Sequence, residues 1–288
     1  QYRGLLKVGY TTVQARTRIA QQYPTLKPGE PPYRIALEES AMRNDGSGFT
    51  DHDIHRYLRM VGVKNPKGEW FRCSVDDVKA AVIAVRTGQL NEENRSLDFK
   101  MRPEQEAAVE KTIAYFKSFS RENANRPPHF LWNAKMRFGK TFAAYQLARK
   151  MNWRKVLVLT FKPAVQSAWE EDLKRHIDFR GWQFISPRGL SYENADKKKP
   201  FVCFGSFQDY LGKNRSTGGI KTKNEWVHAI DWDCVILDEY HYGAWREKAK
   251  DLFEAEDKKE IEFGEGIGIE DFDEEIMPIT TSAYLYLS

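Results

Sequence analysis

The segment "HFLWNAKMRFGKTFAAYQLARK", residues 129–150, places the strongest constraint on how this 288-residue chain folds. A short apolar strand leads into Gly139-Lys140-Thr141, and a helical pattern follows. A phosphate-binding loop needs this order, because its backbone N–H groups and the N-terminus of the next helix meet the phosphates. The usual pattern, G-x-x-x-x-G-K-[ST], has glycine where this chain has Ala134, which is acceptable if that residue does not need a positive φ. The segment predicts a nucleotide site, with a chance Gly-Lys-Thr as the alternative.

The loop residues have distinct expected roles in that site. Gly139 lets the backbone approach the phosphates, Lys140 reaches the β- and γ-phosphates, and Thr141 is a ligand of Mg²⁺. Further nucleotide contacts are expected from the residues before the glycine, which are Ala134, Lys135, Met136, Arg137 and Phe138. ATP and Mg²⁺ are therefore the expected cofactors.

A second segment, "DCVILDEYHY" at residues 233–242, supports the same site. An apolar strand ends there in Asp238-Glu239, and in an open α/β sheet the carboxyl end of such a strand lies beside the phosphate loop. Asp238 is expected to hold Mg²⁺, and Glu239 to position or activate the attacking water. The alternative, a solvated loop after a strand, fits poorly with the upstream Gly-Lys-Thr.

Short apolar runs alternate with helical segments through the second half of the chain. Runs that are apolar along their whole length indicate strands buried on both faces. These runs are "HFLWNA", "KVLVLTF", "FVCFGSF" and "CVILDEY". They predict the α/β class, with a mostly parallel sheet and helices on both faces. The polar stretch "GQLNEENRSLDF" before them places a domain boundary between residues 92 and 93, giving domains 1–92 and 93–288.

Composition limits the partners and the location of the protein. The net charge is +4, but residues 251–275 are strongly acidic, so the remainder is basic and suits a nucleic-acid partner. The three cysteines have neither metal-site nor disulfide spacing, which predicts a reducing, cytoplasmic location. No apolar run approaches the ~18 residues that span a bilayer, and the N-terminus lacks a secretory signal, so no membrane partner is expected.

The ordered motifs of the second half resemble the first RecA-like domain of superfamily 2 helicases and translocases, in the variety found in ATP-dependent restriction enzymes. "MRPEQEAAVEKTI" resembles the Q-type motif, "AKMRFGKT" motif I, "LTFKPAVQSAW" motif Ia, "CFGSFQDYL" motif Ib, "DEYH" motif II and "TSAYLYLS" the start of motif III. The resemblance implies that Gln105 reads the adenine and that His241 couples the ATP state to DNA. It also implies a second RecA-like domain outside these 288 residues, so weak nucleotide binding without steady turnover is expected of this chain.

The first half carries the residue types that metal-dependent phosphodiester cleavage requires. That chemistry needs a carboxylate for the metal, a cation for the phosphate, and a hydroxyl or imidazole near the nucleophilic water. Glu69, Arg18 and the pair Tyr10 and His55 supply these groups. Three of them also have a structural alternative: Tyr10 as a half-buried strand tyrosine, His55 as a histidine that caps its helix or pairs with Asp51, and Glu69 as a glutamate at the exposed start of a strand.

Together these residues resemble the GIY-YIG nucleases, in the branch whose second signature reads K-[IV]-G. The triplet K-V-G at residues 7–9 matches that signature, "DIHRYL" matches the helical histidine at His55, and "GEWF" matches the metal-binding glutamate at Glu69. Arg18 matches the catalytic arginine better than Arg16, because an apolar residue follows it. The resemblance implies a small α+β nuclease domain, which is N-terminally incomplete because the first signature, G-I-Y, does not precede residue 7.

The leading hypothesis is an ATP-dependent DNA restriction or defence enzyme, in which metal-dependent cleavage is coupled to a motor on double-stranded DNA. A methyltransferase or specificity subunit is a further expected partner. Lys162 and the run 197–199 are candidate phosphate contacts, although a lysine run is commonly a solvated face. The acidic stretch would shield basic surface or contact a partner. Two alternatives stay open: a helicase or remodelling motor whose first domain only binds DNA, and a regulatory ATPase with no nucleic-acid partner.

Overall fold

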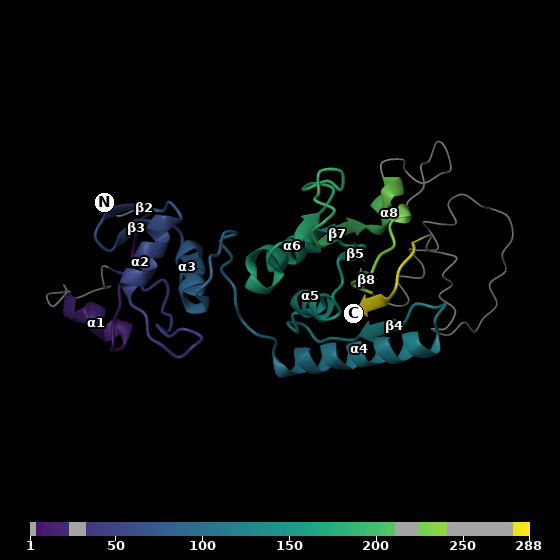
Figure 1. Cartoon of the computed structure of the whole chain (residues 1–288), viewed down its shortest axis with the longest axis horizontal. Coiled ribbons are helices and arrows are strands. Elements are labelled where there is room, and N and C mark those ends of the chain that lie inside the picture. The colour runs from purple at the N-terminus through teal and green to yellow at the C-terminus, as the bar shows by residue number, and fades with distance from the viewer. Residues whose placement is uncertain (1–3, 23–32, 211–223, 241–278) are drawn as a thin grey trace. The chain divides into compact units, whose positions relative to one another are not determined.

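The computed structural model describes residues 4–22, 33–210, 224–240 and 279–288, without the side chains of Gln208 and Asp209. The chain divides into two compact units (Figure 1). The first unit comprises residues 1–99 with 175–180, and the second comprises 100–174 with 181–288. The contacts thus group residues 93–99 and 175–180 with the first unit, whereas the boundary between residues 92 and 93 stays a prediction. No helix among the described residues is both long enough and apolar enough to cross a membrane.

The first unit is built on a small antiparallel sheet with strand order β1-β3-β2. Helices α2 and α3 contact each other, and both contribute side chains to a core around the fully buried Leu58 and Phe71. The elements of this unit are β1 (Leu6–Lys7), α1 (Ala15–Gln22), α2 (Asp51–Met60), β2 (Lys64–Lys67), β3 (Trp70–Arg72), α3 (Val75–Thr87) and the 3₁₀ turn Ile177–Phe179.

Both ends of α3 follow from local sequence signals. Ser74 caps the N-terminus: its hydroxyl accepts a hydrogen bond from the Asp77 backbone N–H, and the Asp77 carboxylate accepts one from the Ser74 backbone N–H. Gly88 ends the helix with a φ of 68°, a left-handed conformation that glycine adopts without steric cost.

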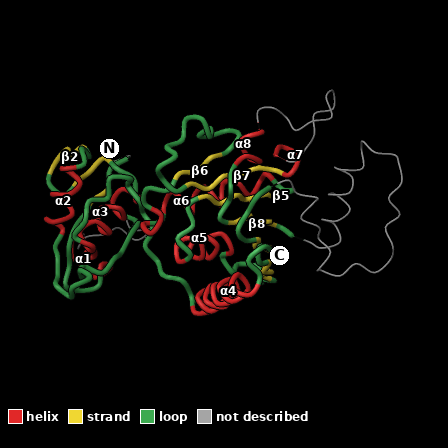
Figure 2. The backbone as a smooth tube through the Cα atoms, turned by 45° about the vertical axis from the view of Figure 1, so that its right-hand side comes forward, coloured by secondary structure: helices red, strands yellow, loops and turns green. Residues whose placement is uncertain are grey.

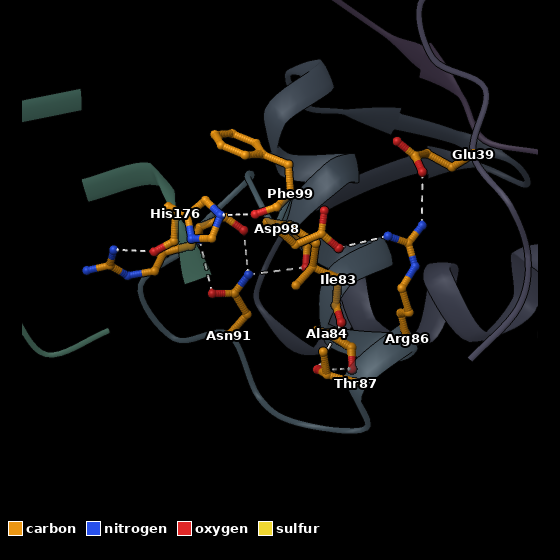
Figure 3. A network of polar contacts seen from close by, with 11 residues as sticks. Glu39, Ile83, Ala84, Arg86, Thr87, Asn91, Asp98, Phe99 and His176 are labelled. Atoms are coloured by element: carbon orange, nitrogen blue, oxygen red, sulfur yellow. Dashed lines mark hydrogen bonds and ion pairs between the residues drawn. The ribbon is translucent and has the colours of Figure 1, made fainter. Parts of the chain in front are cut away.

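A network of polar contacts, buried at Asn91 and His176, fixes the segment that follows α3 (Figure 3). The Asn91 side-chain amide donates to the backbone oxygens of Ala80 and Arg95, while its own oxygen accepts from the Arg95 N–H. Arg86 forms ion pairs with Glu39 and Asp98. His176 is buried, and its Nε2 donates to the Phe99 carbonyl oxygen at 2.8 Å. Because buried polar groups need partners, these bonds give residues 91–99 one defined path.

The second unit contains a six-stranded sheet of order β4-β9-β8-β5-β7-β6, and every strand pair is parallel. The predicted parallel α/β sheet is therefore confirmed. Its elements are α4 (Pro103–Glu122), β4 (His129–Trp132), α5 (Lys140–Lys150), β5 (Lys155–Thr160), a 3₁₀ turn (Pro163–Val165), α6 (Gln166–Arg175), β6 (Gln183–Ile185), β7 (Phe201–Ser206), α7 (Phe207–Tyr210), α8 (Glu225–Ala229), β8 (Cys234–Asp238) and β9 (Tyr284–Leu287).

Helices cover both faces of this sheet. Figure 1 shows α5 and α6 on one side of the strands and α8 on the other. Val227 of α8 packs in a core with Leu157, Leu159 and Leu237, which point to one face because strand side chains alternate. Helix α4 packs beside α5 (Figure 2). With all strands parallel, their carboxyl ends form a single edge, where ligands bind in open α/β sheets.

Candidate functional site

The phosphate loop and Asp238-Glu239 lie at the same edge of the sheet. Strand β4 ends at Trp132 and β8 ends at Asp238, and both of these residues are in register with Leu287 of the intervening β9. The segments that follow β4 and β8 therefore meet across the end of β9. The Lys140 ammonium lies 3.9 Å from the Glu239 carboxylate. The structure thus brings together the two segments from which the nucleotide site was predicted.

The loop backbone shows why alanine is tolerated in place of the first glycine. The positive φ angles in the loop are 66° at Arg137 and 76° at Gly139. Ala134 is not among the described residues with positive φ, and its N–H donates to the Ser288 carbonyl oxygen at 3.2 Å. A side chain at residue 134 is therefore free of backbone strain.

Two side chains from the start of α4 hold the loop. Gln105 is buried; its amide nitrogen donates to the Phe138 carbonyl oxygen at 2.7 Å, and its oxygen accepts from the Arg102 N–H at 2.9 Å. The Arg102 guanidinium donates to the carbonyl oxygens of Arg137 and Phe138. Arg102 was not predicted, and its only sequence signal is its place just before Pro103. The reading of adenine by Gln105 stays a prediction, since both ends of its amide contact backbone here.

A hollow of about 470 Å³ opens beside the loop, within the size range of small-molecule sites. Met136 at the loop tip is 94% exposed, and the Phe138 ring lies edge-on to Trp132 with 6.2 Å between centroids. The lining combines aromatic surface with charges of both signs. It consists of Arg102, Glu104, Ala108, Trp132, Asn133, Ala134, Lys135, Met136, Arg137 and Phe138.

Asp238 is a buried carboxylate with a hydrogen-bond donor on each oxygen. The Trp169 indole N–H donates to Oδ2 at 2.8 Å, and the Glu239 backbone N–H donates to Oδ1 at 2.9 Å. Burial raises the pKa of Asp238, whereas the Trp169 and Glu239 donors and the nearby Lys140 oppose that rise. A carboxylate accepts about four hydrogen bonds or metal contacts, so two donors leave lone pairs for a cation.

Glu239 lies between two ammonium groups. Besides Lys140, the Lys162 ammonium lies 3.1 Å from its carboxylate. Glu239 also has a φ of 57°, a conformation that costs a non-glycine residue about 1 kcal/mol or more. Lys162 was predicted to contact DNA phosphate, and the structure additionally places it against the residue expected to position water.

The donor set at this edge suits Mg²⁺. Asp238 offers carboxylate oxygens, and Thr141, the second residue of α5, offers a hydroxyl. Within the part of the chain that the structure describes, there is no group of three or more His, Cys, Asp or Glu side chains that could hold a metal ion. Mg²⁺ is commonly held by one or two protein oxygens together with substrate phosphates and water, so this sparse set fits a nucleotide-bound ion.

Gly139→Ala is expected to weaken nucleotide binding about 30-fold. A left-handed φ of 76° disfavours any side chain, and an added Cβ would lie 2.7 Å from the Gln105 amide nitrogen. The two effects together cost about 2 kcal/mol, which corresponds to that loss of affinity. The measurement is a titration with fluorescently labelled ADP.

The matched control for this change is Gly181→Ala. Gly181 has a φ of 80°, but nothing lies within 4 Å of an added Cβ. This variant should lose stability and keep its ADP affinity. An unchanged affinity in Gly139→Ala would contradict the assignment of the loop.

In the first unit, Glu69 lies beside the K-V-G segment. Its carboxylate is 3.2 Å from the Lys7 ammonium, and its carbonyl oxygen accepts the Val8 N–H at 2.9 Å. An added Cβ on Gly9 would lie 4.0 Å from the Glu69 carboxylate. The side chain of Glu69 is 45% exposed, so the carboxylate is accessible to a ligand. The structure therefore brings Glu69 and residues 7–9 together.

The other predicted nuclease residues are placed differently. His55 is buried and donates from Nε2 to the Val8 carbonyl oxygen at 2.8 Å, with its ring 5.0 Å from that of Phe71. This position favours a role in holding the end of β1, and a role in proton transfer stays a prediction. Arg18 is an exposed residue of α1, and Tyr10 is 42% exposed. Their convergence on Glu69 also stays a prediction.

Three further predictions concern His241, the acidic stretch 251–275 and the lysine run 197–199. His241 and the acidic stretch 251–275 lie outside the described residues. The lysine run 197–199 precedes β7, at the sheet edge opposite the phosphate loop, and the Lys197 ammonium donates to loop carbonyl oxygens and lies 4.2 Å from the Tyr192 ring centroid. For Lys197 this favours the structural alternative over phosphate contact.

Comparison with known proteins gives two family matches. The family described as "Type III restriction enzyme, res subunit" matches residues 98–264, and the family described as "T5orf172 domain" matches residues 1–86. A curated relative from Mycoplasma pneumoniae (strain ATCC 29342 / M129 / Subtype 1) is 39% identical over 165 residues, which cover 55% of this chain. It carries the provisional name type II restriction enzyme and methyltransferase RM.MpnORF110P, C-terminus. The matched part is 22% of that relative's length.

Two solved structures are similar to part of this chain. The SWI2/SNF2 ATPase core of Sulfolobus solfataricus in complex with dsDNA is 15% identical and has a TM-score of 0.39, covering 67% of this chain and 33% of that one. The SWI2/SNF2 ATPase core domain of the same organism is 13% identical and has a TM-score of 0.38, covering 66% and 31%.

Proposed function

Because the chain belongs to the family of type III restriction enzyme res subunits, we propose that it is part of an ATP-driven restriction enzyme that acts on double-stranded DNA. The second unit is its motor domain and hydrolyses ATP together with a second RecA-like domain. The first unit is a metal-dependent nuclease of the GIY-YIG type. The observation that carries this proposal is the convergence of Lys140, Asp238 and Glu239 at one edge of the parallel sheet.

In the motor, each of these groups has one task. When nucleotide binds, the Lys140 ammonium exchanges its contact with Glu239 for hydrogen bonds to the β- and γ-phosphates. The backbone N–H groups at the start of α5 contact the same phosphates. Asp238 and Thr141 hold Mg²⁺, which supplies neutralisation of phosphate charge when it is bound. Glu239 accepts a hydrogen bond from the attacking water and orients it. Gln105 and Arg102 keep the loop in its phosphate-binding conformation.

In the nuclease, Glu69 holds a divalent ion beside the scissile phosphate. In the absence of metal, the Lys7 ammonium lies 3.2 Å from the Glu69 carboxylate and neutralises its charge. When a metal ion binds this carboxylate instead, the ammonium can turn to the phosphate. Arg18 contacts the phosphate, and Tyr10 with His55 completes the site. The match of residues 1–86 to a T5orf172 domain supports a separate functional unit here.

A protein partner is proposed from the name of the Mycoplasma relative. The name of the Mycoplasma relative joins a restriction enzyme to a methyltransferase, which supports a methyltransferase or specificity subunit as a partner. The alternative function, a helicase or remodelling motor whose first unit only binds DNA, is favoured by one observation. Of the nuclease candidates, Glu69 and His55 contact residues 7–9, and His55 does so by donating to the Val8 carbonyl oxygen, which suits a structural role.

The motor assignment is tested by ATP hydrolysis of the complete gene product, with and without duplex DNA. Hydrolysis is expected to rise with DNA, and DNA binding is expected to weaken steeply with salt because phosphate contacts release counterions. Hydrolysis that is the same with and without DNA would contradict a DNA motor. It would favour a regulatory ATPase without a nucleic-acid partner.

A further inference from the structure

Trp169 of α6 is the feature of the nucleotide site that the proposed function leaves unexplained. Its side chain is 1% exposed, and its indole N–H donates to Asp238 Oδ2 at 2.8 Å. A buried tryptophan needs a hydrogen-bond acceptor, and a backbone carbonyl oxygen usually serves. Here the acceptor is instead the carboxylate expected to bind Mg²⁺.

Trp169 is fixed at both ends. Its backbone carbonyl oxygen accepts the Tyr145 hydroxyl at 2.8 Å, and the two rings pack edge to face with 5.2 Å between centroids. Tyr145 is itself buried and belongs to α5, the helix that begins at Lys140. A continuous path of contacts thus joins the phosphate-binding helix, Trp169 and Asp238. Close packing around both aromatic rings leaves the indole little freedom to turn away.

The contact determines how Asp238 presents its oxygens. One oxygen is held by the Trp169 indole and the other by the Glu239 N–H, so the carboxylate cannot rotate about its C–C bond without breaking a hydrogen bond. The lone pairs that remain point in fixed directions. Partners that orient metal-binding carboxylates in this way typically change metal affinity 10- to 100-fold when they are removed.

We propose that Trp169 is a positioning residue for Asp238, and that its indole N–H fixes the carboxylate in the orientation that binds nucleotide-associated Mg²⁺. This inference rests on the proposed function of the second unit as an ATP-binding motor. It deepens that function by naming a residue that acts on the metal through Asp238. Trp169 itself contacts neither nucleotide nor metal.

The test measures nucleotide binding by the full 288-residue chain, using fluorescently labelled ADP with increasing Mg²⁺ and with EDTA. Trp169→Phe keeps an aromatic side chain and removes the N–H. The Mg²⁺ concentration for half-maximal tightening of ADP binding is expected to rise about tenfold. Affinity in EDTA is expected to stay unchanged, because the phosphate loop is untouched.

Trp232→Phe is the matched control. Trp232 is also 1% exposed in the same unit, but its indole N–H donates to the Val227 carbonyl oxygen, away from Asp238. Like Trp169→Phe, this variant removes one buried indole N–H, but it should leave the Mg²⁺ dependence of ADP binding unchanged. If Trp169→Phe does not fold, benzothienylalanine at residue 169 replaces the N–H with sulfur and preserves the bicyclic shape.

The outcomes separate the two proposals. A Mg²⁺ dependence equal to that of the wild type in Trp169→Phe would overturn the inference. So would equal losses with Mg²⁺ and with EDTA, or the same shift in Trp232→Phe, because each would reveal a general structural role. Wild-type protein that binds no ADP in either condition would instead contradict the proposed function itself.

Discussion

Lys140→Ala is expected to weaken ADP binding about 100-fold. The ammonium supplies charge-assisted hydrogen bonds to phosphate worth about 3 kcal/mol in total, and alanine cannot replace them. The change also removes one of the two cations beside Glu239, so the negative charge of that carboxylate is less compensated. The measurement is a labelled-ADP titration in the presence of Mg²⁺.

Lys150→Ala provides the control for this loss. Lys150 is the last residue of the same helix, where its ammonium pairs with Glu106 at 3.8 Å and with Glu110. Exposed ion pairs of this kind contribute about 1 kcal/mol or less to stability. ADP affinity should therefore match that of the wild type. Equal losses in both variants would contradict a specific phosphate contact by Lys140.

Glu69→Gln is expected to reduce metal-dependent DNA cleavage by the complete gene product at least about 100-fold. Removing a residue that only orients a metal ligand already lowers metal affinity or activity 10- to 100-fold. Removing the charge of the ligand itself should lower them further. The fold should persist, since the side chain is 45% exposed and its ion pair with Lys7 is a surface pair. The measurement is the rate of nicking of supercoiled plasmid at fixed Mg²⁺.

A second glutamate in the first unit controls for the loss of charge and of an ion pair. The Glu39 side chain is 39% exposed and lies 2.9 Å from Arg86. Glu39→Gln removes a charge and an ion pair in the same unit, and residue 39 is far along the chain from the K-V-G segment. It should cut plasmid at the wild-type rate. Retained cleavage in Glu69→Gln would contradict the metal-binding role of Glu69.

The sheet of the second unit was predictable where its strands are long and buried on both faces. The runs at β5, β7 and β8 are buried along almost all of their length, and an apolar pattern reports such burial directly, whereas the four-residue β4 has one buried residue, Trp132. Strand β6 has only three residues, too few for a pattern, so it was not predicted. Strand β9 was interpreted as the start of motif III, and its pairing between β4 and β8 is a tertiary feature.

The candidate site was predictable where function demands a local pattern. Two such patterns can be recognised in a single sequence: the spacing around Gly139, and the Asp238-Glu239 pair after an apolar strand. Each depends on a strand end or a helix start, which is a local feature. The Trp169 contact to Asp238 and the Arg102 contact to the loop join residues far apart along the chain. Such contacts follow from packing, and neither residue type nor spacing signals them.

In the first unit, too, a helix was predictable from the sequence and the contacts of its side chains were not. The helix that carries His55 was expected from the match of "DIHRYL" to the helical histidine of the GIY-YIG nucleases, and it is present as α2. The direction of the His55 ring toward the Val8 carbonyl oxygen depends on how α2 packs on the small sheet. A histidine suited to proton transfer and a histidine that holds a backbone therefore have the same sequence signature.

The most direct test of the account is plasmid cleavage by the complete gene product in Mg²⁺, with and without ATP, beside Glu69→Ala and Lys140→Ala. The account predicts cleavage that requires ATP and is lost in both variants, because the nuclease is driven by the motor. ATP hydrolysis stimulated by DNA, without any cleavage by the wild-type protein, would contradict it. That result would leave a motor whose first unit only binds DNA.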